Sequence, residues 1–222
     1  MADRALIVFD LDGTLIDSAP DIHLAANRVF GSKGLEPFAF DLVKGFIGNG
    51  VGVLVSRLLA CRDLPDSGEL HAEFVRNFIS IYEEAVDLTT LYPGVPPALD
   101  SLSEAGHPLG ICTNKPVGAA RAVLQHFGLE GCFEVIIGGD SLPVRKPDPA
   151  PLHAAIAALG GGKALFVGDS EVDAETARAA RVPFALFTGG YRKTPVEDFG
   201  ARLVFGDYAA LPHLVTHIAD RL

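Results

Sequence analysis

Two carboxylates stand two positions apart near the start of the chain, at Asp10 and Asp12. They follow the apolar run 5–9, which is typical of a buried β-strand. Because side chains alternate in direction along a strand, both carboxylates are expected to point to the same side. Two like charges in that position need a cation, a shared proton or solvent between them. The pair therefore suits a metal site in which one carboxylate attacks and the other transfers protons.

Further polar residues follow other segments that are predicted to be strands. In an open parallel sheet, ligands bind beyond the carboxyl ends of the strands, at the point where the strand order reverses. The polar residues expected to meet at that edge are Thr113, Asn114, Lys115, Lys146, Asp169 and Asp173. Carboxylate oxygens suit Mg²⁺, and hydroxyl and ammonium groups can bind phosphate oxygens. The sequence therefore favours an Mg²⁺ site with Asp10, Asp169 and Asp173, and phosphoryl chemistry in which a carboxylate attacks phosphorus.

The elements that must position these residues alternate along the second half of the chain. Strands are predicted at 109–112, 135–137, 164–167, 184–187 and 203–205. Helices are predicted at 96–104, 117–127, 149–159, 172–180 and 209–221. This alternation is typical of an α/β fold, a parallel sheet with helices on both faces. The strand at 5–9 is expected to join the same sheet, because a single strand is not stable alone.

Residues 16–88 carry helical signals only, so an all-helical block is predicted as an insertion after the first strand. Ser18 with Asp21 resembles a capping box at the start of one helix. A second helix is predicted at 51–59, and a second capping box, Asp66 with Glu69, starts a third that ends near residue 88. The predicted division is a core of 1–15 and 89–222 with a helical domain of 16–88.

Composition restricts the partners. The net charge is −10, which disfavours a nucleic-acid partner because phosphate backbones attract excess Lys and Arg. Cys61, Cys112 and Cys132 form no CxxC pair, which is typical of reduced, cytoplasmic proteins, and they are interpreted as core residues. No apolar run approaches the roughly 20 residues of a membrane span. A small phosphorylated metabolite is the expected partner, and the oligomeric state is left open.

The chain resembles the haloacid dehalogenase superfamily over nearly its whole length. The matching segments are, in order, Asp10-Leu11-Asp12-Gly13-Thr14, Thr113-Asn114, Lys146-Pro147 and Gly168-Asp169-Ser170-Glu171-Val172-Asp173. The resemblance implies a Rossmann-like core with a helical cap inserted after the first strand. It also implies an Mg²⁺-dependent enzyme that works through an aspartyl-phosphate intermediate.

Roles follow from this resemblance residue by residue. Asp10 is the expected nucleophile and a metal ligand, and Asp12 is the general acid and base with only its backbone carbonyl on the metal. Thr113, Asn114 and Lys146 are expected to bind the phosphoryl group. Asp169 is expected to bind Mg²⁺ directly, and Asp173 through water or from outside the inner coordination sphere.

Within the superfamily the chain is most similar to the phosphoglycolate phosphatase family, which implies 2-phosphoglycolate as substrate and glycolate and phosphate as products. The segment 45–51 carries much of this similarity, and its Gly48, Asn49 and Gly50 are candidate substrate contacts. An ordinary turn between helices is the competing interpretation of these three residues.

Other functions remain open from the residues alone. The same core could serve a sugar-phosphate mutase, a pyrophosphatase or a broad phosphatase that acts on other small phosphates, nucleotides included. A dehalogenase needs the nucleophile but neither metal nor leaving-group proton, so Asp12, Asp169 and Asp173 argue against it. A phospho-accepting receiver domain also holds aspartates at a sheet edge, and here the helical insertion and Asp12 argue against that class.

Overall fold

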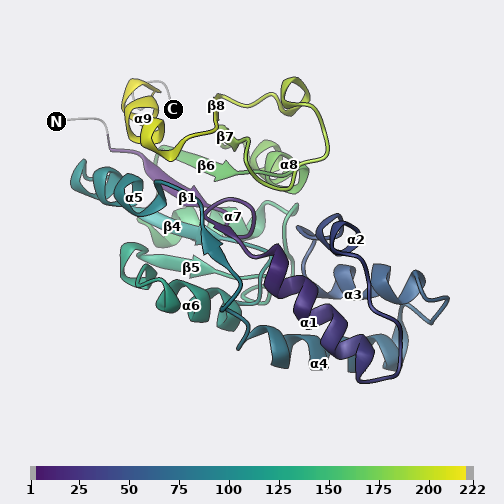
Figure 1. Cartoon of the computed structure of the whole chain (residues 1–222). Helices are drawn as coiled ribbons and strands as arrows, with labels where there is room; N and C mark the ends of the chain where they lie inside the picture. The colour runs from purple at the N-terminus through teal and green to yellow at the C-terminus, as the bar shows by residue number, and fades with distance from the viewer. Residues whose placement is uncertain (1–3, 219–222) are drawn as a thin grey trace.

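The computed structural model describes residues 4–218, and within them six strands form one parallel sheet (Figure 1). The strands run in the order β5-β4-β1-β6-β7-β8. Their bounds are β1 Leu6–Phe9, β4 Leu109–Cys112, β5 Val135–Ile137, β6 Ala164–Gly168, β7 Phe184–Phe187 and β8 Leu203–Phe205. The predicted α/β sheet is confirmed, and each of its strands is confirmed to within one residue at either end.

Two sets of helices cover the two faces of this sheet. The helices of the core are α5 Val95–Glu104, α6 Val117–His126, α7 Ala150–Ala158, α8 Glu171–Ala180 and α9 Leu211–Ile218. Ile7 and Phe9 of β1 pack in one buried cluster with residues of α5, α6 and α9. Leu6 and Val8 pack in another with residues of α7 and α8. Because side chains alternate in direction along β1, this strand contributes to the buried clusters on both faces of the sheet.

Short 3-10 turns complete the core chain. They are η1 Glu130–Cys132, η2 Val196–Phe199 and η3 Tyr208–Ala210. The last predicted helix begins as η3 and continues as α9, and the predicted end at residue 221 lies outside the described residues. Within residues 4–218, no helix combines the length and apolar composition required to cross a bilayer.

Four helices lie between β1 and α5 and gather beside one another at one end of the sheet (Figure 1). They are α1 Ala19–Gly31, α2 Phe40–Lys44, α3 Val51–Ala60 and α4 Gly68–Tyr82. Their buried residues form one cluster, which Ala119 of α6 joins and in which Phe30 makes edge-to-face contacts with Phe38 and Phe74. This separate apolar core supports treating the helices as a unit, and the division at 16–88 stays a prediction.

The helical segment differs from the sequence prediction at its ends. Ile16–Asp17 is strand β2, which pairs antiparallel with β3 at Thr90–Leu91. Helix α4 ends at Tyr82 rather than near residue 88, and α2 was not predicted. Elements this short carry too few residues to show a periodic pattern. The paired strands join the two points where the chain enters and leaves the helical segment.

Both predicted capping boxes before residue 88 are wrong. The Ser18 side chain caps no backbone group and donates to Asp12 Oδ1 at 2.6 Å instead. Asp21 Oδ2 accepts from the backbone N–H groups of Leu88 at 3.1 Å and Thr89 at 2.7 Å. The N-cap of α4 is Ser67 rather than Asp66, and it also makes no side-chain cap hydrogen bond. The side chains of Ser18 and Asp21, which the local spacing predicts to cap a helix, therefore form hydrogen bonds with residues outside that helix.

The interpretation of the cysteines as core residues is right for only one of them. Cys112 is buried in β4, whereas Cys132 is half-buried and Cys61 is exposed just after α3. None of the three forms a disulfide.

Candidate active site

The candidate site lies beyond the carboxyl end of β1, where the strand order reverses. β1 has β4 on one side and β6 on the other, so the chain builds the sheet outward in both directions from it. A crevice opens at such a reversal because the connections on the two sides leave in opposite directions. Residues that follow β1, β4 and β6 therefore meet at one place.

Three buried carboxylates and one buried lysine form the centre of the site. Asp10, Asp169 and Asp173 each offer an oxygen, and these oxygens lie within 4.8 Å of one another. Lys146 Nζ lies 2.8 Å from Asp10 Oδ1 and 2.7 Å from Asp173 Oδ1. We call these four residues the Lys146 centre. Its three acidic groups exceed its single cation, which leaves a deficit of positive charge.

Burial and like charge set the protonation behaviour of this centre. Burial, followed by the charge of Asp173, raises the pKa of Asp10 to about 6, although Lys146 opposes the rise. Burial and the neighbouring carboxylates of Asp173 and Asp10 also raise the pKa of Asp169. Burial alone would lower the pKa of Lys146, but the carboxylates of Asp10 and Asp173 raise it. A further cation among the carboxylates would relieve this repulsion.

Both carboxylate oxygens of Asp173 accept hydrogen bonds. In addition to the Lys146 contact on Oδ1, its Oδ2 accepts from the Ser170 backbone N–H at 3.0 Å and from the Ser170 hydroxyl at 2.5 Å. Ser170 and Asp173 form a capping box at the start of α8. This contact set supports a place for Asp173 outside the inner coordination sphere of a metal.

Asp169 is held by residues from two distant loops. Its Oδ1 accepts from the Thr14 hydroxyl at 2.8 Å, and its Oδ2 accepts from the Tyr191 backbone N–H at 2.6 Å. A Cβ on Gly13, which has a φ of +86°, would lie 2.6 Å from Asp169 Oδ2. A Cβ on Gly190 would also collide with that oxygen. The lack of side chains at Gly13 and Gly190 thus lets the backbone approach the Asp169 carboxylate closely.

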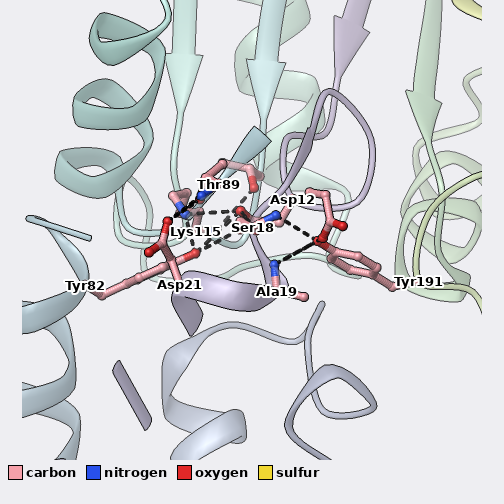
Figure 2. Close-up of polar contacts among 10 residues, drawn as sticks. Asp12, Ser18, Ala19, Asp21, Tyr82, Thr89, Lys115 and Tyr191 are labelled. Atoms are coloured by element: carbon pink, nitrogen blue, oxygen red, sulfur yellow. Dashed lines mark hydrogen bonds and ion pairs between the residues drawn. The ribbon is translucent and has the colours of Figure 1, made fainter. Parts of the chain in front are cut away.

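Asp12 belongs to a second group of polar residues, shown in Figure 2. Its Oδ1 accepts from the Ser18 hydroxyl at 2.6 Å and from Lys115 Nζ at 3.1 Å. Lys115 also donates to the Tyr82 hydroxyl, which lies 3.5 Å from both Asp12 oxygens. We call Asp12, Lys115 and Tyr82 the Lys115 centre. Asp12 Oδ2 has only the long Tyr82 contact among the described residues, so it is available to exchange a proton.

Lys115 is a buried cation with a single ionic partner in the described chain. Its side chain is 3% exposed and that of Asp12 is 12% exposed. Burial lowers the pKa of Lys115, against the attraction of Asp12. Burial and the charge of Asp12 raise the pKa of Tyr82, so its hydroxyl stays neutral.

The residues predicted to bind phosphate lie in the loop after β4. Thr113 is buried and its hydroxyl accepts from the Lys115 backbone N–H at 3.2 Å. Asn114 Nδ2 donates to the carbonyl of Gly48 and to that of Lys146, each at 2.9 Å. Asn114 therefore connects the core to the loop before α3. Its amide nitrogen is already occupied, so the structure shows a bridging position for this residue.

A pocket lies between this loop and the helical segment. Its lining combines groups from both sides: Asp10, Asp12, Ile22, Ile47, Gly48, Gly50, Val51, Leu54, Phe78, Tyr82, Thr113, Asn114 and Lys115. Gly48 and Gly50 thus lie beside Asp10, whereas Asn49 lines a neighbouring cleft with Asp12 and Asp169. The three candidate contacts of the helical segment are near the site, on two sides of it.

Tyr191 and Lys115 carried no predicted role, yet both contact residues of the site. The Tyr191 hydroxyl donates to Asp17 Oδ1 at 2.7 Å and accepts from the backbone N–H groups of Ser18 and Ala19 at 2.9 and 3.0 Å (Figure 2). It thus connects the Asp169 loop to the start of α1. No sequence signal marks Tyr191. The position of Lys115 after β4 correctly predicts that it lies at this edge of the sheet. Only the structure shows that it contacts Asp12.

The donor set fits a divalent metal ion. Three buried carboxylates with one lysine provide hard oxygen ligands and excess negative charge, the combination that Mg²⁺ binds.

Comparisons with known proteins agree with this geometry. A family model for haloacid dehalogenase-like hydrolases matches residues 5–181. A phosphoglycolate phosphatase of Cereibacter sphaeroides is 51% identical over 96% of this chain and 98% of its own length. The phosphoglycolate phosphatase of Rhodobacter capsulatus is 45% identical over 94% of this chain and 95% of its own.

Solved structures give the same result. The crystal structure of a predicted phosphoglycolate phosphatase from Haemophilus somnus has a TM-score of 0.88 and 33% identity, and it covers 97% of this chain and 99% of that chain. The family match includes Asp10, Thr113, Lys146 and Asp169. The chain therefore belongs to the haloacid dehalogenase-like hydrolases.

Proposed function

We propose that this chain is an Mg²⁺-dependent phosphatase that hydrolyses 2-phosphoglycolate to glycolate and phosphate through an aspartyl-phosphate on Asp10. The observation that carries the proposal is the Lys146 centre, three carboxylates around one lysine at the strand-order reversal. Relatives that are 45–51% identical over nearly the whole chain are named phosphoglycolate phosphatases, which supports the substrate.

The side chains of Asp10 and Asp169 and the backbone carbonyl of Asp12 would hold Mg²⁺, with Asp173 acting through water or from outside the inner coordination sphere. Bound there, the ion would neutralise the excess carboxylate charge and stabilise charge on the phosphoryl oxygens. Lys146 would bind the same oxygens and hold Asp10 in position, and Thr113 would donate its hydroxyl to them.

In the first step Asp10 would attack phosphorus, so that a carboxylate–phosphorus bond forms while the bond to the leaving oxygen breaks. Asp12 would give its proton to that oxygen, which leaves as the hydroxyl of glycolate. In the second step water would attack the phosphorus of the aspartyl-phosphate while the bond between phosphorus and the Asp10 oxygen breaks, which releases phosphate and regenerates the Asp10 carboxylate. Asp12 would take the proton from the water. Ser18 and Lys115 hold Asp12 Oδ1, which leaves Oδ2 for both transfers.

The helical segment would act as a cap over this chemistry. We propose 16–88 as the cap domain and 1–15 with 89–222 as the catalytic core, with Gly48, Asn49 and Gly50 as cap contacts to the substrate. Asn114 would bridge the core and the cap through Gly48. Closure of such a cap excludes water from the reacting atoms. The cytoplasmic location stays a prediction.

The decisive experiment measures phosphate release from a panel of 2-phosphoglycolate, glucose phosphates, pyrophosphate and nucleotides, with and without Mg²⁺. The expected result is Mg²⁺-dependent release with 2-phosphoglycolate preferred. Asp10→Asn should abolish release while circular dichroism and thermal unfolding show a folded protein. Release that survives in this variant would contradict the mechanism, and preference for a sugar phosphate would contradict the substrate.

A further inference from the structure

The pocket beside Asp10 has one cationic side chain among the described residues that line it, and that side chain is Lys115. Its other walls beyond the carboxylates are mostly apolar, with Ile22, Phe78 and Leu54 on the cap side. An anionic group placed among such walls loses its water and needs a cation in compensation. Any second anion of a substrate, besides the phosphoryl group, would therefore be directed to Lys115.

Lys115 has a donor left for such an anion. An ammonium group carries three N–H donors. One is directed to Asp12 Oδ1 and another to the Tyr82 hydroxyl. Lys146 differs, because it lies between Asp10 and Asp173 on the phosphoryl side of the site. The two buried lysines thus point to two different anionic groups.

The position of Lys115 fits a substrate in which the second anion lies close to the phosphoryl group. Its Nζ lies 3.1 Å from the carboxylate proposed to protonate the leaving oxygen. In 2-phosphoglycolate a single CH₂ separates that oxygen from the carboxylate carbon. A carboxylate so close to the leaving oxygen is within reach of an ammonium that touches the acid. A sugar phosphate would instead place hydroxyl groups against apolar walls, where they would lack partners.

We propose that Lys115 is the specificity-determining residue for the substrate's carboxylate, and that Tyr82 orients it. This inference rests on the proposed function and deepens it by assigning the second anion of the substrate to one side chain. Arg57, which lies over the Phe46 ring at 5.7 Å and lines the neighbouring cleft, is the competing cation. It does not line the pocket beside Asp10.

The test compares 2-phosphoglycolate with its carboxamide, 2-phosphoglycolamide, which has nearly the same size and no negative charge at that end. We expect Lys115→Gln to lower kcat/KM for 2-phosphoglycolate by about 10- to 100-fold, the loss typical of a charged hydrogen bond. The loss for the carboxamide should be several-fold smaller, so the ratio of the two kcat/KM values collapses toward one. Lys115→Met serves as a second, isosteric variant in case the first does not fold.

Lys33→Gln is the matched control, because Lys33 pairs with Glu73 on the exposed surface of the cap. It should leave the ratio unchanged. Equal losses on both substrates in Lys115→Gln would mean that this lysine acts through Asp12 alone, and would overturn the proposal. A ratio that collapses in Arg57→Gln instead would also overturn it. Absence of activity on either substrate in the wild-type protein would contradict the proposed phosphatase function itself, which is a different outcome.

Discussion

The Lys146 centre and the Lys115 centre each pair a buried lysine with aspartate, yet the net shift in the pKa of the lysine is opposite in the two. Both lysines are almost fully buried, at 1% and 3% side-chain exposure. Two carboxylates contact Lys146 and its pKa is raised, whereas one carboxylate contacts Lys115 and its pKa is lowered by burial. The number of neighbouring carboxylates, rather than burial itself, therefore decides how strongly a lysine holds its charge.

This difference has a chemical meaning. Lys146 stays charged beside the proposed nucleophile and is suited to a constant electrostatic task. The charge of Lys115 is compensated by one carboxylate only, and one of its three N–H donors is available. Lys115 is therefore suited to bind an anionic group of the substrate. Four predictions test this contrast, in order of decreasing effect.

The strongest test removes each lysine in turn. Lys146→Met should lower kcat/KM for every phosphomonoester by about 1,000-fold or more, because a preorganised charge at the phosphoryl group is lost. It should also destabilise the fold by about 3–5 kcal/mol, since two buried carboxylates lose their partner. Lys115→Met should cost less, about 1–3 kcal/mol, because Asp12 is partly exposed. Urea unfolding measures both, and equal free-energy losses would contradict the contrast.

The second test follows stability against pH in the metal-free protein. The pKa of Asp10 is raised to about 6 in the folded state, above its value of about 4 in the unfolded chain. The associated stability is therefore present below about pH 4 and is lost as the pH rises through 6, by roughly 3 kcal/mol.

Mg²⁺ binds the ionised carboxylates, so it should restore this loss at pH 7 and have little effect near pH 4. Thermal unfolding with Mg²⁺ and with a chelator gives the measurement. An increase in metal-free stability from pH 4 to 7 would indicate that Lys146 fully compensates the cluster.

The third test concerns the close approach of the Gly190 backbone to Asp169. Gly190→Ala places a Cβ against Asp169 Oδ2, so it should displace that carboxylate. We expect about a 10-fold or larger loss of kcat/KM together with weaker Mg²⁺ activation, because small misplacements of ligands are costly. Gly131→Ala is the control, since an added Cβ there meets nothing within 4 Å. Unchanged Mg²⁺ dependence in Gly190→Ala would argue against an ion at Asp169.

The smallest effect is expected at Ser18, which shares Asp12 Oδ1 with Lys115. Ser18→Ala removes one of two donors, so kcat should fall by only about 2- to 10-fold, the value of one hydrogen bond. KM should change little, because Ser18 holds the proton donor and not the substrate. A loss as large as that of Lys146→Met would mean that the Lys115 centre tolerates no partial disruption.

Much of the core could be predicted from the sequence. The strand Leu109–Cys112 was predicted with the bounds it has, because buried apolar runs bounded by polar residues carry their own signal. Short elements such as β2 and α2 were missed, since pairing and packing stabilise them rather than local preference. Ser18 and Asp21 matched a capping box locally, but their side chains bind Asp12 and the backbone of Leu88 and Thr89. The local spacing of residues does not reveal hydrogen-bond partners that the fold brings from elsewhere in the chain.

The sequence by itself determined the α/β class, the family and the residues of the Lys146 centre, because these lie in segments with distinctive local patterns. Only the tertiary structure decided that Lys115 meets Asp12, that Tyr191 joins the Asp169 loop to the start of α1, and that Gly48 meets Asn114. These contacts join residues that follow different strands or lie in different units. They form only once the order of strands around β1 has brought those loops to one edge of the sheet.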